Sequence, residues 1–524
     1  MYHPSIFNDV IGPVMRGPSS SHCAAALRIG RMARDLMNGQ IDEVVIEFTP
    51  TGSLATTHTS QGSDMGLFGG LLGWDATDER LINSKQAVQE AGIQIDIRIV
   101  DYEAEHPNTY RLTLSNAKES HTLTAISTGG GMIEVLAIDG YAVSMAGDFY
   151  ETLVYLESGG EDAARAITQG LHADHVFLLD SSSSGSLIEL KMQQFPAVDT
   201  IMELLAGSQV RSVKHISPVL PVLSRANMQV PFTTCAEMLE YNKTRDLTLW
   251  ELAVDYECAR GGLSREQVVA NMMEIVEILE RSIQHGVRGT VYADRILGHQ
   301  SGQFQTQMQS GRLLDGGMLN QMILNVTALM EVKSSMGVIV AAPTAGACAG
   351  LPGATIGAAR KMGLSTEETA HAMLSAGLIG MFIAARATFA AEVGGCQAET
   401  GSGAGMAAAA LVTLAHGTTL QAVNAASMAL QNTLGMICDP VANRVEVPCL
   451  GKNVMAAGNA LACANMALAD FDAVIPLDQV IETMDRVGKS IPSELRCTAL
   501  GGLAITKASK EIEQRLLERS GNQG

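Results

Sequence analysis

Three cysteines lie in segments where glycine and proline constrain the backbone. Cys396 stands in "AAEVGGCQAETGSGAG", and Cys438 and Cys449 enclose "CDPVANRVEVPC". Buried cysteines in an alanine-rich core commonly behave as small apolar residues, but thiolates are also the usual protein ligands of iron-sulfur clusters. Three ligands on a four-iron cluster would leave one iron open as a Lewis acid. The CxxC spacing of zinc and ferredoxin sites is absent, so the spacing leaves both interpretations open.

A second candidate is the run "RGPSSSHCAAALRIG", in which Ser19, Ser20, Ser21 and His22 directly precede an alanine-rich segment. Serine is a frequent helix cap, and hydroxyls beside a helix N-terminus can also bind a carboxylate. The residues alone leave both roles open. A second serine run, 181–184, joins two expected strands and predicts a turn.

Other residues have both a structural and a functional interpretation. Thr344 and Cys348 in "APTAGACAG" could line a pocket or begin a glycine-packed helix. His58 is either a solvated loop histidine or a general base, which must be within reach of the proton that it removes. The triplet Gly129–Gly131 predicts a tight turn or a close approach of the backbone to a ligand.

Composition limits the class of protein. The chain has 524 residues, a net charge of -20 and 4% aromatic residues, so we expect no nucleic-acid partner. The start "MYHPSIFNDVIGPVMRG" lacks the basic and apolar regions of a secretory signal, which predicts a cytoplasmic protein. Nine cysteines in such a chain favour buried thiols or metal ligands over disulfides. Ser334–Ala359 is free of charge, but Pro343 and Pro352 interrupt it, so we expect buried helices and no membrane span.

The order of elements predicts a multidomain fold that combines α/β and all-α parts. Strands are expected at 41–49 and 93–102 and on both sides of the glycine triplet. The segment after residue 150 predicts the order βαββαβ, the proline-bearing segment 217–232 predicts a linker, and the remainder is helical. The expected domains are 1–148 (α/β), 149–217 (βαββαβ) and 233–524 (all-α).

The chain resembles the iron-sulfur-dependent L-serine dehydratases, or L-serine ammonia-lyases, with the beta and alpha parts of that family fused. The motifs that carry the resemblance run along nearly the whole chain and in the order of the family. They are "GPSSSH", "GSLAT", "GGLLGW", "GGGMIE", "SGRLLDGGML", "APTAGACAGLPGA", "GGCQAE", "CDPVANRVEVPC" and "LGGLAITKASKEIE".

The resemblance implies a 4Fe-4S cluster held by Cys396, Cys438 and Cys449 in the all-α domain, and an ACT-like middle domain. His22 and His58 are the expected catalytic residues. The expected substrate-binding residues are Ser19, Ser20, Ser21, Gly129, Gly130 and Thr344. The expected partners are a small amino acid or hydroxy acid substrate and a second copy of the chain in a homodimer.

The chain also departs from the family pattern. The loop after "GSLA" commonly reads TGKGHxTD, whereas this chain has "TTHTSQGSD", so Gln61 occupies the histidine position. Glutamine cannot accept a proton near neutral pH, and His58 is the expected substitute. Cys23 is a further departure, and the roles of Cys23, Cys348 and Cys497 stay open.

The expected activity is elimination of water from L-serine or a close β-hydroxy acid or amino acid, which gives pyruvate and ammonia. An open iron would bind the hydroxyl and assist its departure. Two alternatives stay open because of Gln61 and the altered loop. One is β-elimination from another substrate such as L-cysteine, and the other is an inactive relative that binds amino acids.

Overall fold

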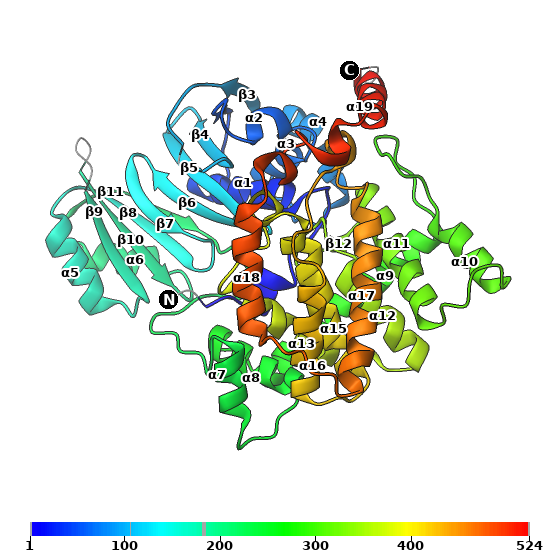
Figure 1. Cartoon of the computed structure of the whole chain (residues 1–524). Coiled ribbons are helices and arrows are strands. Elements are labelled where there is room, and N and C mark those ends of the chain that lie inside the picture. Colours follow the sequence, from blue (N-terminus) through cyan, green and yellow to red (C-terminus); the bar gives the residue numbers. More distant parts are fainter. Residues whose placement is uncertain (1–2, 105, 181–184, 522–524) are drawn as a thin grey trace. The chain divides into compact units, whose positions relative to one another are not determined.

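The structure is a computed structural model that describes residues 3–104, 106–180 and 185–521. It divides into two compact units (Figure 1). Unit 1 comprises Met1–Ser20 and Gln229–Gly524, and unit 2 comprises Ser21–Met228. The change of unit at Met228 lies inside the segment predicted as a linker. The turn predicted over 181–184 lies outside the described residues.

Unit 2 is the mixed α/β part, as predicted, and its first layer is a six-stranded sheet of order β3-β2-β4-β5-β6-β7. Only the β2–β3 pair is parallel. The strands are β2 (Glu43–Phe48), β3 (Gln94–Ile99), β4 (Thr109–Ser115), β5 (Ser120–Gly129), β6 (Met132–Ile138) and β7 (Tyr141–Met145). The helices of this part are α1 (Ala25–Leu36), α2 (Leu54–Thr57), α3 (Ser63–Leu71), η3 (Glu79–Asn83) and α4 (Ser84–Glu90).

The predicted βαββαβ order is confirmed in the rest of unit 2. Its antiparallel sheet has the strand order β11-β8-β10-β9. The elements are β8 (Tyr150–Ser158), α5 (Gly160–Gly170), β9 (His175–Asp180), β10 (Ser186–Met192), α6 (Val198–Leu204) and β11 (Gln209–Ile216). One face of this sheet packs on α5 and α6, while Leu153, Tyr155 and Leu187 from the other face belong to the core of the six-stranded sheet. The predicted segments 1–148 and 149–217 therefore share one core from residue 21 onward.

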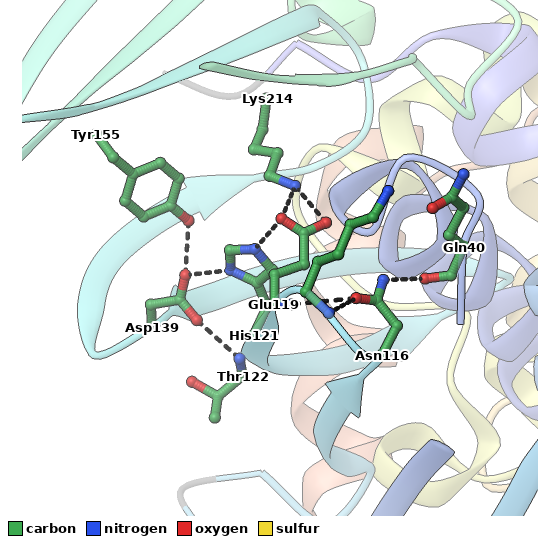
Figure 2. Close-up of polar contacts among 9 residues, drawn as sticks. Gln40, Asn116, Glu119, His121, Thr122, Asp139, Tyr155 and Lys214 are labelled. Carbon is green, nitrogen blue, oxygen red and sulfur yellow. Dashed lines mark hydrogen bonds and ion pairs between the residues drawn. The ribbon is translucent and has the colours of Figure 1, made fainter. Parts of the chain in front are cut away.

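Polar side chains tie the two sheets together (Figure 2). The carboxylate of Asp139, in the β6–β7 turn, accepts hydrogen bonds from His121 Nδ1 and the Tyr155 hydroxyl, both at 2.7 Å. Lys214 on β11 pairs with both oxygens of Glu119 at 2.8 and 2.7 Å. Burial acts to raise the pKa of Asp139, but these hydrogen bonds and one from a backbone N–H hold it below its ordinary value.

Close packing of α1 on α3 fixes the loops that precede each helix. A Cβ on Gly66 would lie 2.0 Å from the carbonyl oxygen of Cys23, and one on Gly70 would lie 2.2 Å from the carbonyl oxygen of Leu27. Only glycine permits so close an approach of two backbones. The helices position the serine–histidine run before α1 and the loop before α3.

We expect Gly70→Ala to lower the free energy of unfolding of unit 2 by about 1–3 kcal/mol, because a new methyl group must push α1 away from α3. Denaturant unfolding followed by circular dichroism measures the change. Gly207→Ala is the matched control, since a Cβ there meets nothing within 4 Å. Equal midpoints for the two variants would contradict the glycine-mediated packing.

Unit 1 is the helical part, as predicted. Its longer helices are α7 (Cys235–Asn242), α8 (Leu249–Gly261), α9 (Arg265–Arg288), α10 (Ser301–Gln309), α11 (Met318–Ser334), α12 (Gly350–Met362), α13 (Thr366–Ala384), α15 (Ser402–Leu414), α16 (Thr419–Gln431), α17 (Cys449–Leu468), α18 (Leu477–Ser490) and α19 (Lys507–Gly521). Its short elements are η1 (Ile6–Val10), β1 (Val14–Met15), β12 (Ile339–Val340), α14 (Ala391–Gly394), η4 (Gln397–Gly401), η5 (Val441–Asn443), η6 (Ser493–Leu495) and η7 (Gly502–Ile505).

Helix α15 forms the centre of this unit. Its sequence, SGAGMAAAALVTL, is apolar on all sides and almost every residue is buried, which is typical of a helix enclosed by others. It contacts α12, α13, α16 and α17. The predicted buried helices are confirmed, and in the described part of the chain none of the helices has the length and apolar composition needed to cross a membrane.

The structure corrects one predicted boundary, because the first twenty residues belong to the helical unit and not to the α/β domain. The buried carboxylate of Glu257 on α8 accepts hydrogen bonds from the Ser5 hydroxyl and, at 2.9 Å, from the Ile6 N–H. Strand β1 pairs with β12 through Val14 and Val340. The segments joined by these contacts lie far apart in the sequence, so no local sequence pattern predicts them.

Candidate functional site

The predicted cysteine ligands are buried in unit 1. Cys396 precedes η4, Cys449 is the first residue of α17, and Cys438 lies in the connection before η5. Their exposed fractions are 2% for Cys396, 5% for Cys438 and 6% for Cys449. Cys396 and Cys438 pack in one small apolar cluster, against which Cys497 also packs. We call Cys396, Cys438, Cys449 and Cys497 the cysteine set.

Hydrogen bonds join the segments that carry the cysteine set. Cys438 N–H donates to the Leu495 carbonyl at 2.8 Å, and Cys497 N–H donates to the Cys438 carbonyl at 2.9 Å. The buried amide of Gln397 donates to the Met484 carbonyl at 2.7 Å and accepts from Gly435 N–H at 2.8 Å. The backbone around Cys396 is thereby fixed against the segment that leads to Cys438.

Burial and the hydrogen bonds between the thiols favour their protonated form. A hydrogen bond with Cys438, together with burial, raises the pKa of the Cys396 thiol well above its ordinary value. The Cys396 contact acts to lower the pKa of Cys438, but the Cys497 contact and burial outweigh it, and burial raises the pKa of Cys449 to about 12. Metal ligation requires thiolates, so metal binding here would release protons.

The chemistry of this donor set fits an iron-sulfur cluster. Soft thiolates select such clusters, and the ligands of a four-iron cluster bind different irons, so they need not converge on one point. Among the described His, Cys, Asp and Glu side chains, no group of three or more is arranged around a single metal ion. We therefore take the cysteine set as a candidate iron-sulfur cluster site.

A carboxyl group that the sequence analysis did not single out lies close to the thiols. Glu399, in η4, accepts a hydrogen bond of 2.7 Å from the hydroxyl of Thr344, a predicted substrate-binding residue. Burial is the larger cause and the like charge of Glu392 the next largest of a rise in the pKa of Glu399 to about 7. The feature of the sequence that could have identified Glu399 is its position three residues after Cys396 in "GGCQAE".

Asn453 is the second residue that the sequence analysis missed. From α17 its side chain bonds the Cys449 carbonyl at 2.8 Å, the Gly346 carbonyl at 2.9 Å and the Gly350 N–H at 2.8 Å. It joins "APTAGACAG" to the helix that begins at Cys449. In the same segment Ala345 N–H donates to the hydroxyl of Ser20 at 3.3 Å, so unit 1 brings the predicted residues Ser20 and Thr344 together.

The serine run does not lie at the N-cap of α1. Residues Ser20–Ala24 form a π-helical turn, η2, and α1 follows with Ala24 at its N-cap and no side-chain cap. Ser19 and Ser20 belong to unit 1, whereas Ser21 belongs to unit 2, where its carbonyl accepts a hydrogen bond of 2.7 Å from Ser127. Ala24, and not a serine, is therefore the N-cap of α1, and the ligand-binding role of the serines stays a prediction.

The glycine triplet is a tight turn between β5 and β6. All three glycines have positive φ angles, 110° at Gly129, 62° at Gly130 and 92° at Gly131. The Gly131 carbonyl accepts a hydrogen bond of 2.5 Å from the buried Arg28 on α1. The structural interpretation is confirmed, and binding of a ligand at Gly129 and Gly130 stays a prediction.

In unit 2, His58 forms a close pair with Asp64. His58 Nδ1 lies 2.7 Å from Oδ1 and 2.9 Å from Oδ2 of Asp64, which also accepts a 2.8 Å hydrogen bond from the Thr59 hydroxyl. The His58 ring packs on Phe48, with 5.4 Å between ring centroids. A carboxylate can only accept, so Nδ1 carries a proton. In neutral His58, Nε2 then has a free lone pair.

His22 has a different environment. It is 2% exposed, and burial lowers its pKa to about 4. Its Nε2 lies 3.1 Å from the Thr57 hydroxyl, which already donates to the Ser53 carbonyl at 2.7 Å. Because that hydroxyl has one proton, His22 Nε2 must be the donor. His22 is a neutral hydrogen-bond donor at physiological pH and a weak base.

Comparisons with known proteins agree with the resemblance. The family profile described as "Serine dehydratase alpha chain" matches residues 244–504. A probable L-serine dehydratase alpha chain of Bacillus subtilis is 35% identical over 285 residues, which are 54% of this chain and 95% of that protein. The corresponding probable beta chain is 42% identical over 154 residues, 29% of this chain and 69% of that protein.

The match to one further relative spans nearly the whole chain. An L-serine dehydratase of Helicobacter pylori is 25% identical over 501 residues, which are 94% of this chain and 96% of that protein. The helical unit thus carries an alpha-type sequence, and further sequence of the beta type is present in the same polypeptide. The chain belongs to the L-serine dehydratase family.

Proposed function

We propose that the protein is an iron-sulfur-dependent lyase that converts L-serine to pyruvate and ammonia. Membership of the L-serine dehydratase family and burial of the three motif cysteines in one helical unit support this proposal. The packing of Cys396 against Cys438 is the single observation that carries the cluster assignment. Homodimer formation and a cytoplasmic location stay predictions.

Cys396, Cys438 and Cys449 would hold a 4Fe-4S cluster. When bound, such a group supplies a Lewis acid that weakens the bond between carbon and a hydroxyl leaving group. Water would be largely excluded from this site, since the three thiols are almost completely buried. Gln397 and Asn453 hold the backbone at Cys396 and Cys449 and thereby fix the spacing of the ligands.

His58 would remove the α-proton of the substrate. Asp64 orients the ring and keeps the proton on Nδ1, so that Nε2 is the basic atom. Asp64 lies in the first turn of α3. The pair therefore offers the base that is lost from the family position now occupied by Gln61.

The product mixture tests the proposed reaction. Chain purified without oxygen and loaded with iron and sulfide is incubated with L-serine, L-cysteine, L-threonine and D-serine, and pyruvate, ammonia and sulfide are measured. We expect equal amounts of pyruvate and ammonia from L-serine, at the highest kcat/KM of the panel. Faster release of sulfide from L-cysteine would indicate a desulfidase. Binding of L-serine without turnover would indicate an amino-acid-binding relative.

A further inference from the structure

Lys333, in the last turn of α11, is a buried lysine of unit 1 without a carboxylate partner. The residue is 1% exposed. Among the described residues, its ammonium donates to the Val445 carbonyl, and no carboxylate oxygen lies within 4.0 Å of it. A carbonyl and the C-terminal end of a helix supply only partial negative charge. Because buried lysines are rare unless they are paired, the position of Lys333 indicates an anionic partner.

The other buried lysines of the described chain have such partners. Lys191 Nζ lies 3.0 Å from a carboxylate oxygen of Glu151. Lys214 Nζ lies 2.7 Å from a carboxylate oxygen of Glu119. Lys333 is therefore the exception among them.

A short series of contacts connects Lys333 to Cys449. Val445, whose carbonyl accepts from Lys333, lies four residues before Cys449. A Cβ on Gly346 would lie 3.3 Å from Val445 Cγ1. The carbonyls of Gly346 and Cys449 both accept from the side-chain amide of Asn453, at 2.9 and 2.8 Å. The ammonium group is thus placed beside the segment that carries this cysteine.

The charge of Lys333 acts on groups that can become anionic. Burial raises the pKa of Cys449 to about 12 and that of Cys348 to about 11, and for both thiols the charge of Lys333 is the largest opposing influence. The same charge opposes the rise in the pKa of Glu399 that burial causes. Lys333 therefore favours the thiolate form of Cys449, the form that metal ligation requires.

We infer that Lys333 is a positioning residue for the cluster, whose ammonium compensates the negative charge that the site acquires when Cys449 binds as a thiolate. The inference rests on the proposed function, because that function supplies the cluster. Ligation converts three neutral thiols to thiolates, and net charge is one of the properties that set the reduction potential of a cluster. An unpaired lysine costs stability in the metal-free chain and becomes stabilising once the thiolates form.

The test compares Lys333→Met, which removes the charge, with Lys333→Arg, which keeps it. Each full-length chain is loaded with iron and sulfide without oxygen and then exposed to an iron chelator. We expect Lys333→Met to lose iron about 10-fold faster than the wild-type chain or more, the usual effect of losing a residue that supports metal ligands. Lys333→Arg should lose iron more slowly than Lys333→Met. The reduction potential of the cluster should be more negative in Lys333→Met, since a nearby positive charge favours the reduced form.

The metal-free chains provide a readout that is independent of activity. Removal of an unpaired buried charge relieves its desolvation cost, so metal-free Lys333→Met should unfold at the same denaturant concentration as the wild-type chain or at a higher one. A lysine with a merely structural role would lower the midpoint in both forms. Lys361→Met, at an exposed position near the end of α12, is the matched control and should change neither the midpoint nor the loss of iron.

The outcomes separate this inference from the proposed function. Loss of iron from Lys333→Met at the wild-type rate would overturn the inference, and so would a metal-free Lys333→Met chain that is less stable than the wild type. Unchanged loss of iron with a raised KM for L-serine would overturn it too, and would assign Lys333 to the substrate carboxylate. A wild-type chain that takes up no cluster would refute the cluster assignment itself, and the inference with it.

Discussion

Cys438→Ser is expected to give a colourless protein without lyase activity. A hydroxyl is a poor replacement for a thiolate on iron, and Cys438 contacts both Cys396 and Cys497. Iron content should fall from about four atoms per chain to below one, and the visible absorbance of the reconstituted cluster should disappear. Iron and sulfide assays, absorption spectra and pyruvate formation measure these changes.

Cys463→Ser provides the matched control for this experiment. Cys463 is fully buried on α17, the same helix that begins at Cys449, but its thiol interacts with Asn432 and Asn459. The control should retain iron, colour and activity. A Cys438→Ser protein with wild-type iron content would exclude Cys438 as a ligand, whatever its activity.

His58→Gln is expected to lower kcat/KM for L-serine by about 10²- to 10⁴-fold, the usual contribution of a general base. Cluster content should be unchanged, since the substitution is in unit 2. Asp64→Asn should also lower kcat, because an amide can donate to Nδ1 and favour the tautomer that is protonated at Nε2. Steady-state kinetics over a range of pH separates these effects, and His172→Gln, at an exposed position, is the control.

A second substitution tests whether the position of the base is interchangeable. Gln61→His in the His58→Gln background restores a histidine where the family commonly has one, and we expect partial recovery of kcat. Recovery would show that His58 performs the lost function of that position. Wild-type kcat/KM in the His58→Gln single variant would contradict a role for His58 as the base.

Most elements of the fold could be predicted from local sequence. Alternating strands such as β2 and the βαββαβ order were visible because side chains alternate between the faces of a sheet. The end of α1 was also predictable, since Asn38 and Gly39 adopt the positive φ angles that stop a helix. The π-helical turn at Ser20–Ala24 was not, because serine before an alanine-rich run is typical of an ordinary cap.

The candidate site was predictable only where a residue type is chemically distinctive. The cysteines and His58 stood out by type, but the roles of Glu399, Asp64 and Asn453 depend on contacts that the sequence does not display. Asn453 reaches Gly346 across more than one hundred residues. Asp64 became informative only when its carboxylate was found beside His58 Nδ1.

The placement of the first twenty residues in unit 1 has a consequence for biosynthesis. This segment is made before Ser21–Met228, whereas α8, α13 and β12, on which it packs, are made only after the whole of Ser21–Met228. Contacts between such distant segments form slowly because a long loop must close. Residues 3–20 must therefore remain unattached while the α/β unit is made, and the β1–β12 pair can form only after Val340 has been synthesised.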